Sequence, residues 1–202
     1  MKLYYFNGAC SLSPHIVALE AGIPITLVKA DVKTKKTADG GDYLAINSKG
    51  AVPALQLDDG RVLTEGPAIV QYMADLKPDS KLAPKAGSFE RYQLMEILNY
   101  ITSEIHKTFS PLFNPATTAE QREATIANLG KKFDWISGFL GNKPYLMGDT
   151  FTVADPYLFT VVNWTNFVKV DLSKWPVLVA YQARVAARPK VQEAMKSEGL
   201  LK

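Results

Sequence analysis

Cysteine and histidine are scarce in this chain of 202 residues, which has one cysteine and two histidines. A single thiol, Cys10, excludes an internal disulfide and suits a reducing compartment. Three soft side chains are too few for an ordinary four-ligand zinc site, so we expect no bound metal.

Long hydrophobic runs and basic runs are also missing. No stretch approaches the roughly 18 apolar residues that a membrane-spanning helix needs, and the apolar run at residues 3–6 is shorter than the core of a signal peptide. The 23 basic residues nearly balance the 20 acidic ones, and no five basic residues are consecutive. We therefore expect a cytoplasmic protein with neither nucleic acid nor membrane as a partner.

Residues 1–78 predict an α/β domain. Residues 3–6 and 25–28 favour strands, and between them a helix begins near Ser11 or Ser13 and ends at Gly22. Strands over residues 52–57 and 61–64 flank a hairpin turn, and a second helix opens at Gly66. Residues 33–49 have the composition of a surface loop. The resulting order, β-α-β-β-β-α, is the thioredoxin-like arrangement.

Residues 79–87 contain proline, glycine and lysines that are typical of a linker, and the remainder favours helices only. Long helices are predicted over residues 88–110 and 119–140, and shorter ones over 156–167, 177–187 and 190–196. Thr152 and Asp155 have the spacing of a helix-capping box with Thr152 as the cap. The prediction is therefore an α/β domain at 1–78 followed by an all-α helical-bundle domain at 88–202.

The only cysteine lies at the turn between the first strand and the first helix. There Cys10 faces the free N–H groups and the positive dipole end of the helix, which stabilise a thiolate and lower the thiol pKa below about 8.5. An inert, half-buried cysteine is the alternative. Because position 13 is Ser13, a Cys-x-x-Cys dithiol is absent, so redox chemistry here would use one thiol.

Two further turns offer backbone groups to a peptide-like ligand. Pro53 opens a strand where a thioredoxin-like domain has a cis proline, and a cis bond turns the Val52 N–H and C=O outward to pair with an extended peptide. At Glu65-Gly66-Pro67, backbone N–H groups can bind a carboxylate and Glu65 an ammonium, as an amino-acid head group requires. An edge-strand proline and a plain helix cap are the alternatives.

The predicted helix over residues 88–110 has a polar face and an apolar face. Asn99, Ser103 and His106 align within about 60° of arc, at spacings of four and three. Solvated helix faces usually carry Lys and Glu, so these small polar groups are candidate ligand contacts, with a solvated face as the alternative. His15 is expected to be structural or exposed. The apolar face consists of Leu94, Leu98, Ile101, Ile105 and Phe109.

Together these features resemble the cytosolic glutathione S-transferases. The resemblance rests on Ala9-Cys10-Ser11, Val52-Pro53, Glu65-Gly66-Pro67-Ala68-Ile69 and the Thr152-x-x-Asp155 box, and it covers essentially the whole chain. Cys10 with Asn99, Ser103 and His106 is similar to the bacterial beta class in particular. The resemblance implies glutathione as co-substrate, no metal, and a homodimer whose helical domain completes the electrophile pocket.

The resemblance also implies roles for the glutathione-binding residues. Val52, before a cis Pro53, pairs with the cysteinyl part of glutathione. Glu65 and Gly66 hold the γ-glutamyl head, and Lys35 approaches the glycine carboxylate. Many relatives have a serine at position 66, so one hydroxyl contact to the head group is expected to be missing here.

Further roles follow from the same resemblance. Cys10 lies beside the glutathione sulfur. Asn99, Ser103 and His106 lie near glutathione, some of them reaching it from the partner subunit. Asp155 is implied to be a structural capping residue rather than a catalytic one.

The expected function is attack of an enzyme-stabilised glutathione thiolate on a small apolar electrophile, a detoxifying conjugation. Lowering a thiol pKa by two units takes about 2.7 kcal/mol, which one helix dipole and one donor supply. Cys10, Ser11 and His106 are the candidate donors. The alternatives are a reductase that acts through a Cys10–glutathione mixed disulfide and non-catalytic sequestering of apolar ligands. The expected pocket walls are Phe109, Leu112, Phe113, Tyr157 and Trp164.

Overall fold

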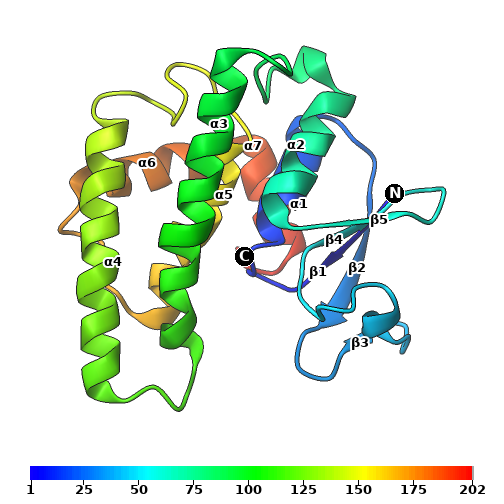
Figure 1. Cartoon of the computed structure of the whole chain (residues 1–202), viewed down its shortest axis with the longest axis horizontal. Coiled ribbons are helices and arrows are strands. Elements are labelled where there is room, and N and C mark those ends of the chain that lie inside the picture. Colours follow the sequence, from blue (N-terminus) through cyan, green and yellow to red (C-terminus); the bar gives the residue numbers. More distant parts are fainter. Residues whose placement is uncertain (202) are drawn as a thin grey trace.

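A computed structural model describes residues 1–201; Lys202, the last residue of the predicted helical domain, lies outside the described residues. A sheet with two helices forms one side of the molecule, and the remaining helices form the other side (Figure 1). The predicted order, an α/β unit followed by helices, is confirmed.

The sheet has five strands in the order β3-β2-β1-β4-β5. β1 is parallel to β2, as expected across a helical crossover, and antiparallel to β4. Leu3 pairs with Leu55 and both are fully buried, so this register sets the centre of the sheet. The strands are Lys2–Tyr5 (β1), Thr26–Asp31 (β2), Lys36–Thr37 (β3), Ala54–Gln56 (β4) and Val62–Thr64 (β5).

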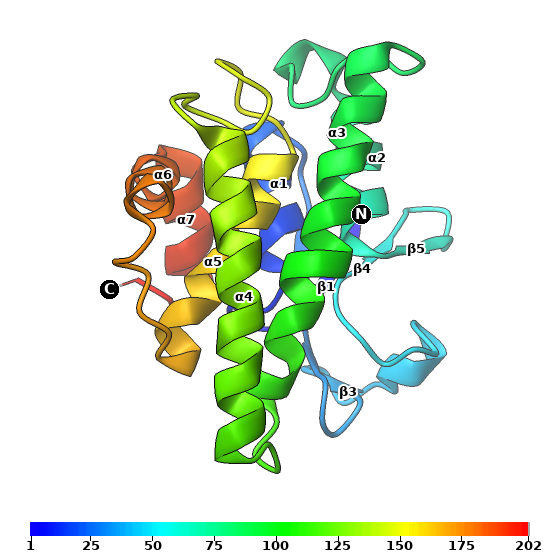
Figure 2. The same cartoon turned by 60° about the vertical axis from the view of Figure 1, so that its left-hand side comes forward.

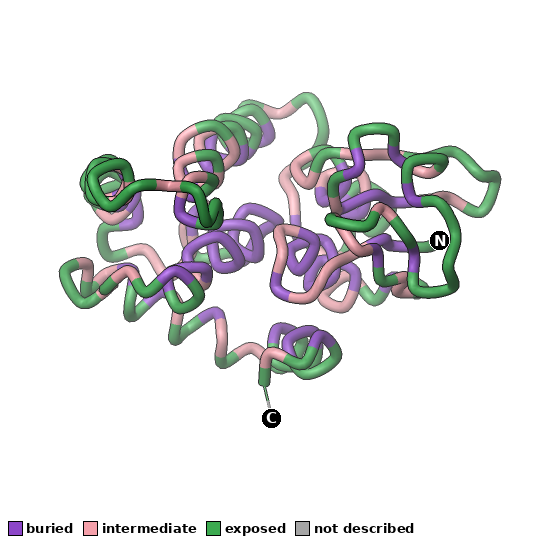
Figure 3. Tube along the Cα trace, turned by 90° about the horizontal axis from the view of Figure 1, so that it is seen from below, coloured by how far each residue is buried: buried purple, intermediate pink, exposed green. Residues whose placement is uncertain are grey.

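Two helices of the first unit link the sheet to the helical side. α1 (Leu12–Glu20) packs on α2 (Gly66–Leu76) and also on α5 (Ala154–Val168) and α7 (Pro189–Ser197). Most residues of α1 and α5 are buried, and Figure 3 shows the buried residues concentrated where the two sides meet. The residues that hold the two sides together therefore include the helix that follows Cys10. Short 3₁₀ turns lie at Tyr43–Ala45 (η1) and Pro78–Ser80 (η2).

The helix predicted over residues 88–110 changes type along its length. Ser88 caps an α-helix, Phe89–Tyr100 (α3), which continues as a π-helical segment, Ile101–His106 (η3), and a 3₁₀ segment, Lys107–Phe113 (η4). The predicted apolar face, Leu94 to Phe109, is buried as expected. The long helix predicted over residues 88–110 is present, but it is not α-helical throughout, because the π segment has i to i+5 hydrogen bonds.

The other helices agree closely with the prediction. α4 (Ala119–Leu140) has the expected bounds and packs against η3 and η4, the segments that continue α3 (Figure 2). α5, α6 (Pro176–Ala186) and α7 each begin one or two residues earlier than expected. Pro156 is therefore the third residue of α5, in the first turn, where its missing N–H costs no intrahelical bond.

Asp155 is fully buried and its carboxylate accepts hydrogen bonds from the backbone N–H groups of Leu146 and Thr152, at 2.9 and 2.8 Å, and from the hydroxyls of Thr152 and Tyr181. Its structural role is as expected. The expected cap is wrong, because the Thr152 hydroxyl donates to Asp155 instead of accepting from the helix, and Val153 is the residue before the first turn. Burial raises the pKa of Asp155 to about 6, although its donors lower it.

Residues 1–201 lack two features, a membrane-spanning helix and a metal-binding cluster. Within this range there is no helix with the length and apolar character needed to cross a membrane. The same residues contain no group of three or more His, Cys, Asp and Glu side chains placed to hold a metal ion.

Candidate active site

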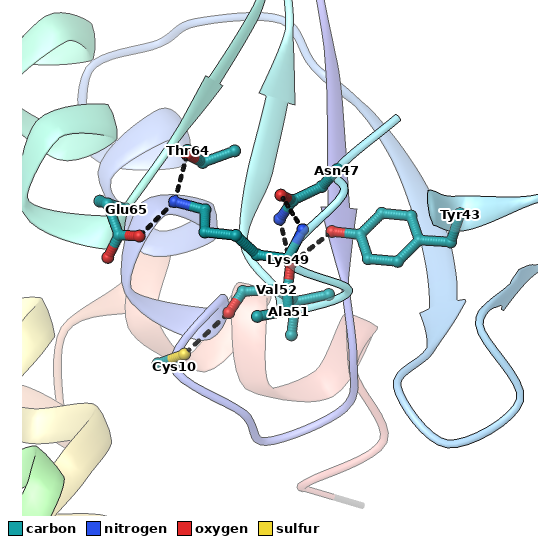
Figure 4. Close-up of polar contacts among 8 residues, drawn as sticks. All are labelled: Cys10, Tyr43, Asn47, Lys49, Ala51, Val52, Thr64 and Glu65. Carbon is teal, nitrogen blue, oxygen red and sulfur yellow. Dashed lines mark hydrogen bonds and ion pairs between the residues drawn. The ribbon is translucent and has the colours of Figure 1, made fainter. Parts of the chain in front are cut away.

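Segments from both sides of the molecule meet at Cys10. The Cys10 thiol donates to the Val52 carbonyl at 3.2 Å (Figure 4). The Val52–Pro53 bond is cis, as expected. The loop before it is fixed at Ala51, whose carbonyl accepts from the Tyr43 hydroxyl and the Asn47 amide, both at 2.7 Å.

A polar cavity of about 300 Å³ opens on one side of Cys10 and His106. Val52, Pro53, Glu65 and Gly66 line it, as the sequence predicted. Pro67, from the predicted Glu65-Gly66-Pro67 turn, and Tyr157, expected as an apolar wall, line it too. The other lining residues were not predicted, because each is a single polar or small residue outside a recognisable motif. These are Asn47, Lys49, Ala51, Thr64, Thr102 and Lys107.

An apolar cavity of about 480 Å³ opens on the other side of the same two residues. Phe113 and Trp164 line it as predicted, whereas Tyr157 lines the polar cavity instead. Phe109 and Leu112 do not line it, because they are buried in the core behind. The full lining is Phe6, Asn7, Gly8, Ala9, Cys10, Val32, His106, Ser110, Phe113, Trp164, Phe167 and Leu200.

The Cys10 thiol has a higher pKa than the sequence predicted. Burial raises the pKa to about 12, and the Glu65 carboxylate adds to the rise. The N–H groups of Cys10 and Ser11 and the charge of Lys107 lower the pKa, but by less. The prediction of a depressed pKa is therefore wrong: the helix start acts as expected, and desolvation of the thiolate outweighs it.

The Ser11 hydroxyl faces the backbone before the turn. It accepts from the Phe6 N–H at 3.1 Å and donates to the Phe6 carbonyl at 3.2 Å, in a fully buried position. Ser11 thus closes the turn that carries Cys10. The group through which Ser11 acts on the thiol is its backbone N–H, not the hydroxyl that the sequence suggested as a donor.

His106, the last residue of η3, joins the two cavities and is held from two sides. Its Nδ1 atom forms a 2.8 Å hydrogen bond with the Tyr157 hydroxyl, and its ring meets the Trp164 ring edge-on, with centroids 4.8 Å apart. Burial, reinforced by the nearby charge of Lys107, lowers the pKa of His106 to about 4. The imidazole is therefore neutral at physiological pH.

Glu65 has a strained backbone at the start of α2. Its φ of +72° lies in a region that side-chain-bearing residues rarely adopt. Its carboxylate forms an ion pair with Lys49, whose ammonium also donates to the Thr64 hydroxyl at 2.8 Å (Figure 4). The next residue, Gly66, begins the helix and lines the cavity.

Three predicted ligand residues lie outside the linings of both cavities. The Lys35 ammonium donates to the Gly50 carbonyl at 2.8 Å. Asn99 and Ser103 are exposed, and the Ser103 hydroxyl donates to the Asn99 carbonyl at 3.1 Å. His106, at the end of the π segment, lines both cavities, whereas Asn99 before the segment and Ser103 within it lie on the surface.

The end of the chain fixes the turn before Cys10. The buried Glu198 carboxylate accepts from the Gly8 N–H at 2.9 Å and pairs with His15 Nδ1 at 2.9 Å. The Trp164 indole donates to the Gly8 carbonyl at 2.8 Å. The structural role expected for His15 is confirmed. Its partner, Glu198, lies 183 residues later in the chain, so no local sequence pattern could predict their contact.

Two family models match the chain. The N-terminal domain of glutathione S-transferase matches residues 8–76, and the C-terminal domain of the same family matches residues 100–189. Over 200 residues, 99% of this chain and 100% of the relative, it is 47% identical to glutathione S-transferase GstA of Escherichia coli O157:H7. The chain therefore belongs to the glutathione S-transferase family.

Solved structures agree with this assignment. A bacterial beta class glutathione S-transferase of Sphingomonas chungbukensis has 45% identity and a TM-score of 0.96, with 100% of both chains covered. A sphingomonad glutathione S-transferase complexed with glutathione has 43% identity and a TM-score of 0.95, again with 100% of both covered. The predicted fold and the resemblance to the beta class are confirmed.

Proposed function

We propose that this protein is a glutathione transferase that conjugates glutathione to small apolar electrophiles. The observation that carries the proposal is the meeting of a polar and an apolar cavity at Cys10 and His106. A thiol at this junction would have its peptide part in the polar cavity and its reaction partner in the apolar one. The glutathione bound by a relative of 43% identity supports the choice of thiol.

In the proposed complex the cysteinyl part of glutathione pairs with the backbone of Val52 beside Pro53, and the γ-glutamyl head reaches Glu65 and the Gly66 N–H. The positions of these residues in one cavity support this orientation. Lys35 is proposed to approach the glycine carboxylate. Asn99 and Ser103, which are exposed on the helical side, are proposed to reach the glutathione of a partner subunit.

The thiolate of glutathione is stabilised by neutral donors in this proposal. When the Tyr157 hydroxyl donates to Nδ1 of His106, Nε2 carries the proton and can donate to the glutathione sulfur. Cys10, with a pKa of about 12, keeps its proton and serves as a second donor once glutathione occupies the Val52 carbonyl to which the thiol now donates. Donors of this kind contribute about 1.5–3 kcal/mol each when the acceptor is charged, enough for a shift of about two pKa units.

The wider assembly is also part of the proposal. We propose a cytoplasmic homodimer with a detoxifying role, in which residues 1–78 bind glutathione, 79–87 link, and 88–202 complete the electrophile side. Exposed apolar side chains on the helical side support a contact with a second copy, because contiguous exposed apolar surface marks interaction sites. They lie on α3 and α4 and are Phe89, Tyr92, Met95, Trp135 and Phe139.

Steady-state conjugation of glutathione to a chloronitrobenzene, beside a small-disulfide reductase assay, tests the proposal. We expect conjugation by the wild type, a fall of about tenfold to a hundredfold for His106→Ala, and most of the conjugation retained by Cys10→Ala. Loss of reduction alone in Cys10→Ala assigns Cys10 to redox chemistry. A wild type that binds glutathione but performs neither reaction contradicts the proposal and favours sequestering of apolar ligands.

A further inference from the structure

A lysine with no assigned role lies at the Glu65 end of the polar cavity. The Lys49 ammonium pairs with the Glu65 carboxylate and donates to Thr64, and Figure 4 shows its side chain extending towards both. The two charged side chains are 50% and 66% exposed. An ion pair this exposed gains little net free energy, so an incoming ligand can separate it at low cost.

The pair matches the two charges of an amino-acid head group. An α-ammonium complements the Glu65 carboxylate, and an α-carboxylate complements the Lys49 ammonium. Gly66 has no hydroxyl to offer that carboxylate. The other lysine in the lining, Lys107, directly follows His106 in the chain and so lies nearer the sulfur end.

We propose that Lys49 is a substrate-binding residue whose ion pair with Glu65 opens when glutathione binds. Lys49 then takes the α-carboxylate of the γ-glutamyl head, and Glu65 takes its ammonium. This inference rests on the proposed function. Since Lys49 contacts the head group and not the sulfur, it acts on KM and leaves kcat unchanged.

Two glutathione analogues distinguish two roles of Lys49: binding the α-carboxylate of the γ-glutamyl head, and only orienting the Glu65 side chain. 4-Aminobutyryl-Cys-Gly keeps the ammonium and lacks the α-carboxylate, whereas glutaryl-Cys-Gly keeps the carboxylate and lacks the ammonium. For Lys49→Met we expect KM to rise about tenfold with glutathione and with the glutaryl analogue. With the aminobutyryl analogue we expect Lys49→Met and the wild type to agree within about twofold.

Two variants control the experiment. Lys33→Met removes the same charge from an exposed residue that lines neither cavity, so all its KM values should equal those of the wild type. Lys49→Arg keeps the charge and should restore KM to within about threefold, which also covers a Lys49→Met chain that fails to fold.

Two results overturn the inference while leaving the proposed function intact. One is an equal rise of KM for all three thiols in Lys49→Met. The other is a rise with the aminobutyryl analogue and none with the glutaryl analogue, which makes Lys49 only a support for Glu65. Failure of the wild type to bind glutathione by calorimetry instead overturns the proposed function, and the inference with it.

Discussion

Two acidic residues lie at the starts of two helices, and they differ in burial, in hydrogen-bond partners and in backbone conformation. Asp155, in the first turn of α5, is buried and accepts hydrogen bonds from three residues. Glu65, just before α2, is 66% exposed, pairs with one half-exposed lysine side chain and has a positive φ. Both carboxylates lie near the positive end of a helix dipole.

The contrast separates a structural acid from a binding acid. A buried carboxylate with its acceptor positions filled has no capacity left for a ligand, and its removal leaves buried donors unpaired. An exposed carboxylate on a strained backbone keeps that capacity, and strain of this kind persists where function requires it. Charge and helix position alone do not distinguish the two.

The largest effect is expected from Asp155→Ala. It leaves the N–H groups of Leu146 and Thr152 and the Tyr181 hydroxyl without their acceptor, and we expect a loss of about 4 kcal/mol in the free energy of unfolding. Urea unfolding measures the loss. Glu65→Ala is the matched control and should change the stability by less than about 1 kcal/mol. Similar losses in the two variants contradict the comparison.

The second largest effect is expected in the pH dependence of stability, which should differ between the wild type and Asp155→Asn. The pKa of Asp155 is raised to about 6, so the folded state binds this proton more tightly than the unfolded chain. The resulting stabilisation is complete below about pH 4 and is lost as the pH rises through 6, by about 1–3 kcal/mol. Asp155→Asn should remove this decline.

The titration of His106 changes the stability with pH in the opposite direction, so its contribution has to be separated from that of Asp155. Its pKa is lowered to about 4, so stability falls as the pH falls from about 6.5 to 4. The contribution of Asp155 is therefore the difference between wild type and Asp155→Asn at each pH, measured by thermal unfolding between pH 4 and 7. If stability changes with pH in parallel for the wild type and Asp155→Asn, the pKa of Asp155 is not raised.

Glu65→Gln should affect binding and not stability. Loss of the negative charge removes the proposed partner of the glutathione ammonium, and we expect KM to rise at least about tenfold, or about 1.4 kcal/mol. The free energy of unfolding should stay within about 0.5 kcal/mol. Glu123→Gln, at an exposed position of α4, should change neither quantity. An unchanged KM for Glu65→Gln removes Glu65 from the binding site.

The smallest effect is expected from Glu65→Gly, which should raise the free energy of unfolding, whereas most substitutions lower it. Glycine adopts the positive φ without a steric cost, which offsets its greater entropy when unfolded. We expect a net stabilisation of about 0.5–1 kcal/mol together with a raised KM. Lys81→Gly, at a φ of +57° outside the site, should stabilise the protein without changing KM. Destabilisation of Glu65→Gly shows that the turn stores no strain.

Local pattern was enough for most of the fold. The bounds of α4 were predicted residue for residue. The cis Val52–Pro53 bond was expected from the thioredoxin-like arrangement and not from the proline alone, for which an edge strand was the alternative. The edge strand β3 was missed, because two residues carry no alternation to detect. Glu198 was missed for another reason: its contacts with His15 and Gly8 form only when the end of the folded chain packs against its beginning.

The residues of the candidate site were predicted better than the pKa of its cysteine. Cys10, Val52, Glu65 and His106 do line one cavity. The pKa of Cys10 was predicted in the wrong direction, because a sequence reveals the helix start and not the depth of burial. Lys49 was missed because its significance lies in facing Glu65, 16 residues later in the chain.

The π segment at Ile101–His106 makes the second half of this helix sensitive to chain length. One residue added or removed there turns everything beyond it by roughly a quarter of a revolution, since each helical residue advances about 100°. His106 would rotate away from both cavities while Asn99, upstream, kept its place. Sequence alignments of relatives should therefore tolerate substitutions in this segment far better than insertions or deletions, and any gap opened there signals a different active site.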